Sequence, residues 1–202
     1  MSGHRPDPLQ ALLADLQVLP GVGQRTAQRM ALHLLERDRN GAKRLAASLE
    51  QAMDQVKHCQ RCRNYTVEEI CTICANPRRQ QRTCCVVETP ADVFALEQSN
   101  VFDGVYFVLL GRLSPIDGIG PSDLGLDLLQ QHLESACFDE LIIATNSSIE
   151  GEATAYYIQE MCAGKNLNIS RLAQGVPLGG ELEYIDKSTL ALAINNRKNL
   201  ND

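Results

Sequence analysis

The 202-residue chain contains no tryptophan, and aromatic residues make up only 4% of it. Aromatic platforms, on which unpaired bases stack, are therefore not expected to dominate any surface of the protein. No apolar run approaches the ~20 residues of a membrane-spanning helix. The first ten residues, MSGHRPDPLQ, also lack the hydrophobic region of a signal peptide. We therefore expect a cytoplasmic protein with no membrane partner.

The chain also lacks a G-x-x-x-x-G-K-[ST] loop, which would hold the phosphates of a nucleotide. Near the C-terminus, residues 181–186 are predicted to form a short strand that ends in Asp186. Such a strand could be the acidic Walker B element of a nucleotide hydrolase, but that interpretation needs the missing loop. We therefore expect no nucleotide cofactor, and we expect Asp186 to cap a helix over residues 187–196.

Eight cysteines are present, and without an export signal they are expected to be reduced. Two Cys-x-x-Cys pairs, eight residues apart, are formed by Cys59, Cys62, Cys71 and Cys74. Four thiolates at this spacing can surround one tetrahedral ion, for which zinc is the best match. The predicted site is structural, because four protein ligands leave no open position for a substrate or water. Its thiolate form is expected to be favoured by nearby cations, namely Lys57, Arg61 and Arg63.

Two other uses of these pairs stay open on the sequence alone. They could be two independent redox motifs, although such a motif normally stands alone beside a βαβ unit. They could also form two disulfides. Of the other cysteines, Cys84 and Cys85 are expected to lie in the core of a strand. No role beyond packing is indicated for Cys137 or Cys162.

The net charge of −6 conceals an asymmetry between the two halves of the chain. Residues 1–90 carry 13 Lys and Arg against 9 Asp and Glu, whereas residues 91–202 carry 6 against 16. This pattern predicts that a polyanion such as DNA contacts the first half and that proteins contact the second. Ordinary scatter of solvated charge could give the same excess, so the asymmetry is supporting evidence only.

The first half begins with a helical pattern. Leucine spacing predicts an amphipathic helix from Pro8 to Leu16, and residues 19–23 must then turn the chain sharply. A second helix follows from residue 24, and a third is predicted over residues 42–57. On the second helix, His33 has no partner in the sequence and is expected to be a surface or packing residue.

The segment LPGVGQRTA, between the first two of these helices, resembles the helix-hairpin-helix DNA-binding motif. Glycines let the backbone approach a phosphate closely, and the hairpin amides and the helix N-terminus offer donors to it. Contacts to the phosphate backbone, independent of base sequence, are therefore expected. The residues expected to make them are Gly21, Gly23, Gln24, Arg25 and Arg29. The alternative is a plain αα-hairpin whose glycines only make the turn.

The second half alternates between continuous apolar segments and helical segments. Strands are predicted over residues 84–88, 105–110, 140–145 and 167–172, and helices over 90–99, 122–137 and 151–163; residues 77–82 are predicted to be a loop. This alternation indicates a parallel sheet with helices on both faces, and hence a multidomain α/β protein. Functional groups are expected where strands end and helices begin, at Glu88, Gly111 and residues 146–152.

Glu88 and the later segment ATNSSIEGEATA resemble the Toprim domain of topoisomerases and primases. Catalytic Toprim domains carry an Asp-x-Asp pair that holds magnesium, where this chain has Asn146 and Ser148. Glu150 and Glu152 match the acidic tail of the motif. Because neutral oxygens supply no countercharge for magnesium, we expect an inherited scaffold without metal chemistry. Two alternatives remain open: strand-end carboxylates that are merely solvated, or a divalent ion still held by Glu88, Asp117 and Glu150.

Taken together, the helical hairpin, the four cysteines, the Toprim-like segment and the final GVPLGGELEYIDKSTLALAI resemble the RecR family of bacterial recombination mediators along essentially the full length. The resemblance implies domains at 1–57 (helix-hairpin-helix), 58–78 (zinc finger), 79–174 (Toprim) and 175–202 (C-terminal subunit contacts). It also implies a non-catalytic DNA-repair protein that acts with RecO and RecF proteins as a ring-like homotetramer, helping to load recombinase onto gapped DNA. The rival functions are a Toprim-type magnesium-dependent nuclease or topoisomerase, and a redox or zinc-handling protein.

Overall fold

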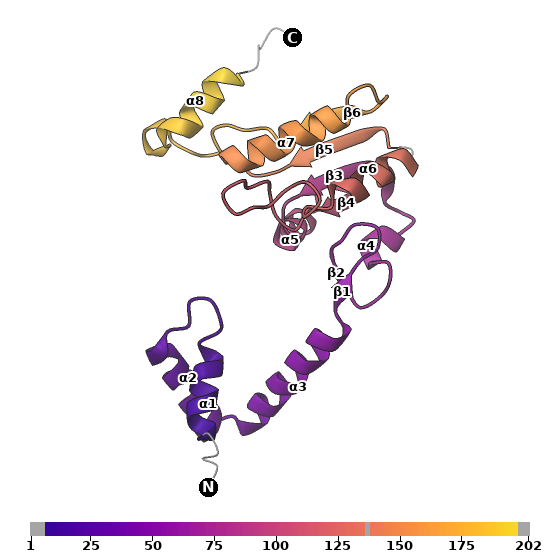
Figure 1. Cartoon of the computed structure of the whole chain (residues 1–202). Helices are drawn as coiled ribbons and strands as arrows, with labels where there is room; N and C mark the ends of the chain where they lie inside the picture. The colour runs from indigo at the N-terminus through magenta and orange to yellow at the C-terminus, as the bar shows by residue number, and fades with distance from the viewer. Residues whose placement is uncertain (1–6, 136–137, 198–202) are drawn as a thin grey trace. The chain divides into compact units, whose positions relative to one another are not determined.

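A computed structural model describes residues 7–135 and 138–197 of the chain. Within these ranges, no helix is both long enough and apolar enough to cross a membrane. The chain divides into two compact units, of which the first ends at Val56 and the second begins at Lys57. Both units are drawn in Figure 1.

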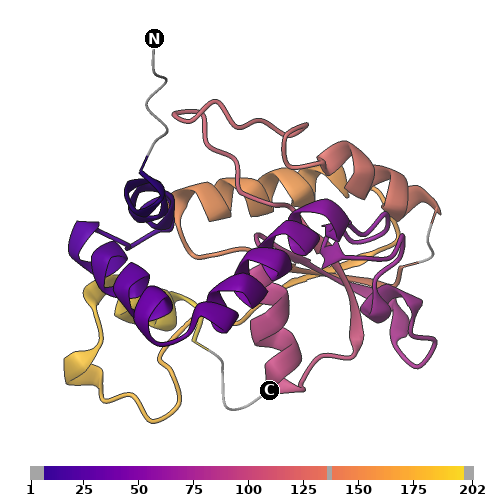
Figure 2. The same ribbon diagram turned by 90° about the horizontal axis from the view of Figure 1, so that it is seen from below.

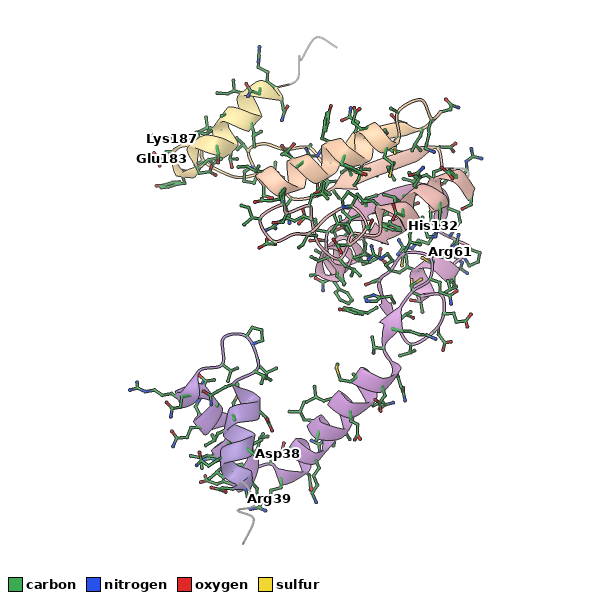
Figure 3. All side chains as sticks on the ribbon, viewed as in Figure 1. Asp38, Arg39, Arg61, His132, Glu183 and Lys187 are labelled. Atoms are coloured by element: carbon green, nitrogen blue, oxygen red, sulfur yellow. The ribbon has the colours of Figure 1, made fainter. Side chains whose placement is uncertain are left out.

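The first unit consists of three helices, seen from two directions in Figures 1 and 2: α1 (Pro8–Leu16), α2 (Gln24–Glu36) and α3 (Arg39–Gln55). Asp38 caps α3, because its Oδ1 atom accepts a hydrogen bond of 2.7 Å from the Gly41 amide. Asp38 and Arg39 are labelled at this helix start in Figure 3. The predicted start at residue 42 was therefore three residues late. It missed the cap because a glycine lies in the first turn.

Packing within the first unit leaves much apolar surface uncovered. Ala27 and Ala31 of α2 are fully buried, and α2 contacts both α1 and α3. Between the helices runs an open groove of about 920 Å³ whose wall is mostly leucine, with Leu12, Leu16, Leu34, Leu35, Leu45 and Leu49. Leu45 and Leu49 are exposed and the other four are half-buried, so the unit does not fully bury its own apolar face.

The second unit is built on a four-stranded sheet, with strands β3 (Gln80–Val87), β4 (Gly104–Val108), β5 (Glu140–Ala144) and β6 (Asn168–Arg171). Its order is β4-β3-β5-β6, and every neighbouring pair is parallel, as the continuous apolar strands predicted. The prediction of a loop through residue 82 is wrong, because β3 begins at Gln80, which pairs with Gly104.

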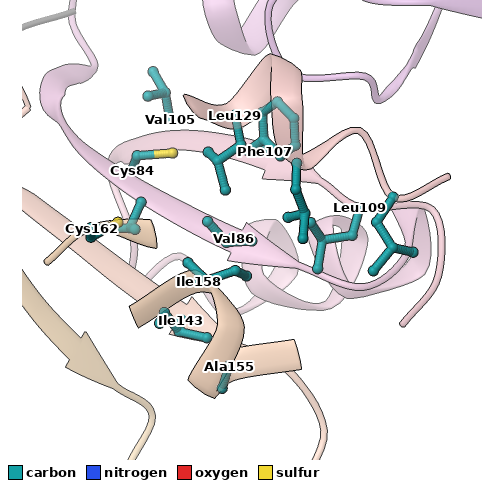
Figure 4. Packing of buried hydrophobic residues seen from close by; sticks show 13 residues of the cluster. Cys84, Val86, Val105, Phe107, Leu109, Leu129, Ile143, Ala155, Ile158 and Cys162 are labelled. Carbon is teal, nitrogen blue, oxygen red and sulfur yellow. The ribbon is translucent and has the colours of Figure 1, made fainter. Parts of the chain in front are cut away.

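Helices cover both faces of this sheet: α5 (Pro90–Ser99) lies on one face, and α6 (Leu126–Ser135) and α7 (Ile149–Met161) lie on the other. Figure 4 shows Val86 and Phe107 from the sheet packed with Leu129 and Ile158 from the helices on the second face. Cys84 and Cys162 belong to this core, and Cys85 to the opposite one. Core positions for Cys84 and Cys85 are therefore confirmed; Cys137 lies outside the described residues.

The helix starts follow their capping residues. Thr89 and Asp92 form a capping box at α5, with Pro90 in the first turn, and the helix spans residues 90–99 as predicted. Ser148 caps α7, which therefore begins at Ile149, two residues earlier than predicted. The start predicted for α6 at residue 122 was four residues early, because residues 121–125 form turns that end at Gly125, where φ is +66°.

Two smaller elements complete the second unit. The cysteine segment contains the antiparallel strands β1 (Lys57–His58) and β2 (Tyr65–Thr66) and the short helix α4 (Thr72–Ala75). The C-terminal segment contains a 3-10 turn, η1 (Leu182–Tyr184), and the helix α8 (Lys187–Asn195). The predicted strand over 181–186 is wrong: its apolar residues have no neighbouring strand to pair with, and they form the turn. Asp186 caps α8 as predicted, accepting hydrogen bonds of 3.0 Å from the amides of Ser188 and Thr189.

Candidate functional site

The four cysteines of the predicted metal site come together in one buried cluster. The sulfur atoms of Cys59, Cys62, Cys71 and Cys74 all lie within 4.8 Å of one another. Zinc–sulfur bonds of about 2.3 Å would place tetrahedral sulfurs roughly 3.8 Å apart, and the Sγ atoms of Cys62 and Cys71 are 3.5 Å apart. The four residues are free thiols rather than disulfides. The donor set and its spacing therefore suit one structural zinc ion.

Backbone turns aim these thiols inward. The first pair lies in a tight turn, in which the Arg63 amide donates to the Cys59 carbonyl at 2.9 Å. In the second pair, Cys71 caps α4, so that its sulfur accepts from the Cys74 amide. Another amide, that of Cys71, donates to the Cys59 sulfur at 3.2 Å. These amides stabilise thiolate charge on the cluster and orient the sulfurs before any metal binds.

Crowding of four thiols makes their ionisation interdependent. A hydrogen bond from Cys62, with others from Cys74, holds the pKa of Cys71 well below its usual range. Hydrogen bonds to Cys62 and Cys71, reinforced by burial, raise the pKa of Cys74. One thiolate is thus readily formed without a cation, whereas four need a metal charge to compensate them, so metal binding must release protons.

Two of the cations near the cysteines make hydrogen bonds to backbone carbonyls. Arg61 donates to the Cys74 carbonyl at 3.1 Å and lies beside His132 of α6 (Figure 3). Burial, reinforced by Arg61, lowers the pKa of His132. The expectation for Arg63 needs correction: its guanidinium turns away from the sulfurs and donates to the carbonyls of Leu109 and Leu124. Arg63 therefore ties the cysteine segment to the sheet.

At the helical hairpin, the two glycines differ in what requires them. Gly21 has φ +79°, a left-handed conformation that favours glycine. Gly23 has φ −84° and ψ 175°, which any residue adopts, and a side chain there would meet nothing within 4 Å. Backbone strain therefore does not require the glycine at position 23, although glycine is favoured over alanine at a helix N-cap.

The predicted phosphate-binding residues are grouped at the start of α2. Gly23 is its N-cap, and Gln24, Arg25 and Arg29 are exposed along its first two turns. The first turn contains no acidic residue, and no side chain caps it. By contrast, α1, α3, α5, α7 and α8 each have a side-chain cap. The N-terminal amides of α2 are thus left for an external acceptor.

The strand-end site is organised around Glu88, which is 97% buried at the end of β3. Its carboxylate accepts hydrogen bonds from both nitrogens of Asn146, at 2.8 Å from the backbone amide and 2.7 Å from the side chain. Arg112 lies 3.9 Å from the same carboxylate. Close packing here needs Gly151, because a side chain on it would come within 2.1 Å of the Asn146 carbonyl.

These donors do not fit magnesium. The ion is held by carboxylates and retained waters, but the Glu88 oxygens are already hydrogen-bonded and face the charge of Arg112. Among residues 7–135 and 138–197, the cysteines are the sole group of three or more His, Cys, Asp or Glu side chains close enough to share an ion. The alternative set Glu88, Asp117 and Glu150 is therefore not brought together.

Two basic residues at this edge of the sheet were not predicted from the sequence to belong to the site. Arg112, in the loop after β4, compensates the buried charge of Glu88. Arg171, at the end of β6, pairs with Glu152 of α7 and so lowers the pKa of that carboxyl group. Their partners lie 24 and 19 residues away along the chain, so no local sequence pattern could predict these two ion pairs. The only sequence feature that pointed to them was a basic residue close to the end of each strand.

Comparisons with known proteins agree with this arrangement. Family models match in chain order: the RecR helix-hairpin-helix over residues 9–53, the RecR zinc finger domain with four cysteines over 56–76, the Toprim domain over 82–173 and the RecR C-terminal region over 175–198. A curated relative from Saccharophagus degradans, "Recombination protein RecR", is 54% identical over 192 residues, covering 95% of this chain and 98% of its own. The matches cover the helical hairpin, the cysteine cluster and nearly all of the parallel sheet, and the chain belongs to the RecR family.

Proposed function

We propose that this RecR protein is a DNA-binding recombination mediator in recombinational repair, with no catalysis of its own. In this proposal it forms a clamp-like oligomer in the cytoplasm and helps to load recombinase at gapped DNA. The helix-hairpin-helix module (1–57) contacts DNA, and the zinc finger (58–78) is a rigid joint. The Toprim domain (79–174) offers its face to partner proteins of the RecO and RecF types. The C-terminal segment (175–202) contributes to subunit contacts.

The observation that carries DNA binding is the uncapped N-terminus of α2. Its amides, the glycine backbone at positions 21 and 23, and the exposed side chains of Arg25 and Arg29 all offer donors on one small surface. A phosphate satisfies such a set well, since it is an anion with several acceptor oxygens. Nothing in the set reads base edges, so binding is independent of sequence and sensitive to salt.

Absence of catalysis is supported by the environment of Glu88. Its carboxylate is committed to Asn146 and lies near Arg112, so it is neither a free metal ligand nor a free base. The alternative function is a Toprim-type magnesium-dependent nuclease or topoisomerase. That alternative would need carboxylates where Asn146 and Ser148 stand.

Oligomer formation is supported by apolar surface in two places. The leucine-lined groove of the first unit is open to solvent. In the C-terminal segment, Leu178, Leu182 and Tyr184 are each more than 60% exposed. Burial of such surface between copies is favourable, and the RecR resemblance implies a homotetramer. A small basic excess on each subunit then acts repeatedly on one DNA molecule.

The test is the double variant Arg25→Ala and Arg29→Ala. We expect it to weaken DNA binding equally for all sequences and to flatten the dependence of affinity on salt. Fluorescence anisotropy with two unrelated sequences measures both. Unchanged salt dependence would remove the hairpin as the DNA site.

A second experiment tests the oligomer. Native mass spectrometry of the wild type gives subunit number and zinc per subunit together, and a monomer would contradict the clamp.

A further inference from the structure

Basic side chains continue along α2 well beyond the hairpin. Arg25, Arg29, His33 and Arg37 are spaced four residues apart, and all four are exposed. They line one open surface hollow of about 440 Å³, together with Gln28, Leu32 and Glu36. Residues four apart form a ridge on the helix surface, with a rise of about 6 Å per step. The ridge therefore extends about 18 Å along α2.

These four side chains make no polar contact with the rest of the described protein. In the part of the chain that the structure describes, none of them donates a hydrogen bond or forms an ion pair. Some other arginines are engaged: Arg39 donates to the Leu35 carbonyl, and Arg63 and Arg171 bond within the second unit. At the start of α2, Arg25 opposes the helix dipole, and its charge repels that of Arg29 four residues on. His33 and Arg37 lie at the C-terminal end, where the dipole favours cations. Helix stability therefore accounts for that end of the ridge but not for its start.

We infer that this ridge is a track for one strand of nucleic acid, extending the DNA interface from the hairpin along α2 to Arg37, its C-cap residue. The inference rests on the proposed function. It adds His33 and Arg37 as phosphate contacts, and it gives His33, otherwise only a surface residue, a specific role as a donor.

Continuity with the hairpin favours a nucleic-acid strand over an acidic protein, because Arg25 and Arg29 belong both to the ridge and to the proposed phosphate site. Duplex DNA presents a phosphate on each strand every 3.4 Å or so of axis, so about 18 Å of ridge corresponds to roughly five base pairs. Leu32, 42% exposed in the same hollow, offers an apolar contact suited to a sugar. The imidazole of His33 has an N–H donor in either tautomer.

The test uses the full-length protein and labelled DNA, single-stranded and duplex, in a potassium chloride series followed by anisotropy. The slope of log affinity against log salt is negative, and Arg37→Ala should make it shallower by about 0.7 for a single strand or about 0.9 for a duplex, for each subunit in contact. His33→Lys, which adds a fixed cation, should make the slope steeper by the same amount. The matched control is Arg44→Ala, because Arg44 is an exposed arginine on α3 outside the hollow. It should behave as wild type.

Three results would overturn the track: a wild-type slope for Arg37→Ala, an equal loss for Arg44→Ala, or competition by polyglutamate as strong as that by DNA of equal charge. The last result would assign the ridge to acidic proteins. The double variant Arg25→Ala and Arg29→Ala separates the two proposals. If it weakens binding while Arg37→Ala does not, the hairpin site stands and the track fails. If neither changes binding, the proposed function fails as well.

Discussion

The backbone amide of Val108 donates a hydrogen bond of 2.8 Å to the carbonyl oxygen of Cys62. Val108 lies on β4, an outer strand of the parallel sheet, and Cys62 is one of the four zinc-site cysteines. The cysteine turn thus satisfies a donor that an edge strand would otherwise leave unpaired. Ordering of the zinc site and integrity of the sheet edge are therefore linked within the second unit.

Cys71→Ser should lose stoichiometric zinc and destabilise the second unit, because binding of a structural zinc contributes to folding free energy. Finger peptides gain about 10–16 kcal/mol; a loss of even about 3 kcal/mol would lower the melting temperature of a chain this size by roughly 6–12 °C. Metal content by mass spectrometry and melting by calorimetry measure both effects. Cys162→Ala, which removes a core thiol outside the cluster, is the control and should keep its zinc. Unchanged melting of Cys71→Ser would refute the structural role.

Arg63→Ala should destabilise the protein by about 1–3 kcal/mol, because the carbonyls of Leu109 and Leu124 lose their donor. These carbonyls lie at the two ends of the loop that carries Arg112, so hydrogen exchange in residues 110–124 should accelerate. Urea unfolding and exchange mass spectrometry measure the two effects. Arg63 has φ +63°, so Arg63→Gly removes the side chain while relieving backbone strain. A stable Arg63→Gly variant with unchanged exchange would show that the guanidinium does not hold this loop.

Gly23→Ala should cost only modest stability while weakening DNA binding. The backbone at Gly23 suits alanine, and the new methyl group would meet no atom within 4 Å. Alanine is a poorer N-cap than glycine, so the expected loss of unfolding free energy is about 0.5–1 kcal/mol. A phosphate approaching the backbone would meet that methyl group. Gly21→Ala is the counterpart: its φ of +79° predicts a cost of about 1 kcal/mol or more. Wild-type DNA affinity for Gly23→Ala would count against close backbone approach.

The sequence predicted those features that depend on local pattern. Continuous apolar segments predicted the parallel sheet, and the spacing of Cys59 and Cys62 from Cys71 and Cys74 predicted the metal cluster. Strand prediction failed over residues 181–186, where the apolar pattern has no neighbouring strand to pair with. Short apolar patterns without a partner do not determine a strand.

Contacts between distant residues could not be predicted. Arg63 reaches a carbonyl 61 residues away, at Leu124, and Asn146 reaches Glu88 across 58 residues. A single sequence records which residues are present but not which turn, sheet edge or loop brings them together. The charge of Arg63 was therefore attributed to the adjacent thiolates, although its side chain bonds to the sheet and its loop.

Magnesium should neither bind at the Toprim-like edge nor support DNA cleavage or relaxation. The oxygens of Glu88 are occupied by Asn146, and Arg112 supplies the positive charge that a metal would otherwise bring. Addition of millimolar magnesium should therefore leave the melting temperature unchanged, and a supercoiled plasmid should stay intact. Arg112→Ala removes the cation that competes with a metal ion for Glu88. Manganese titration followed by electron paramagnetic resonance compares metal binding by this variant with that by the wild type. Magnesium-dependent cleavage by the wild type that Glu88→Gln abolishes, at an unchanged melting temperature, would overturn the non-catalytic interpretation.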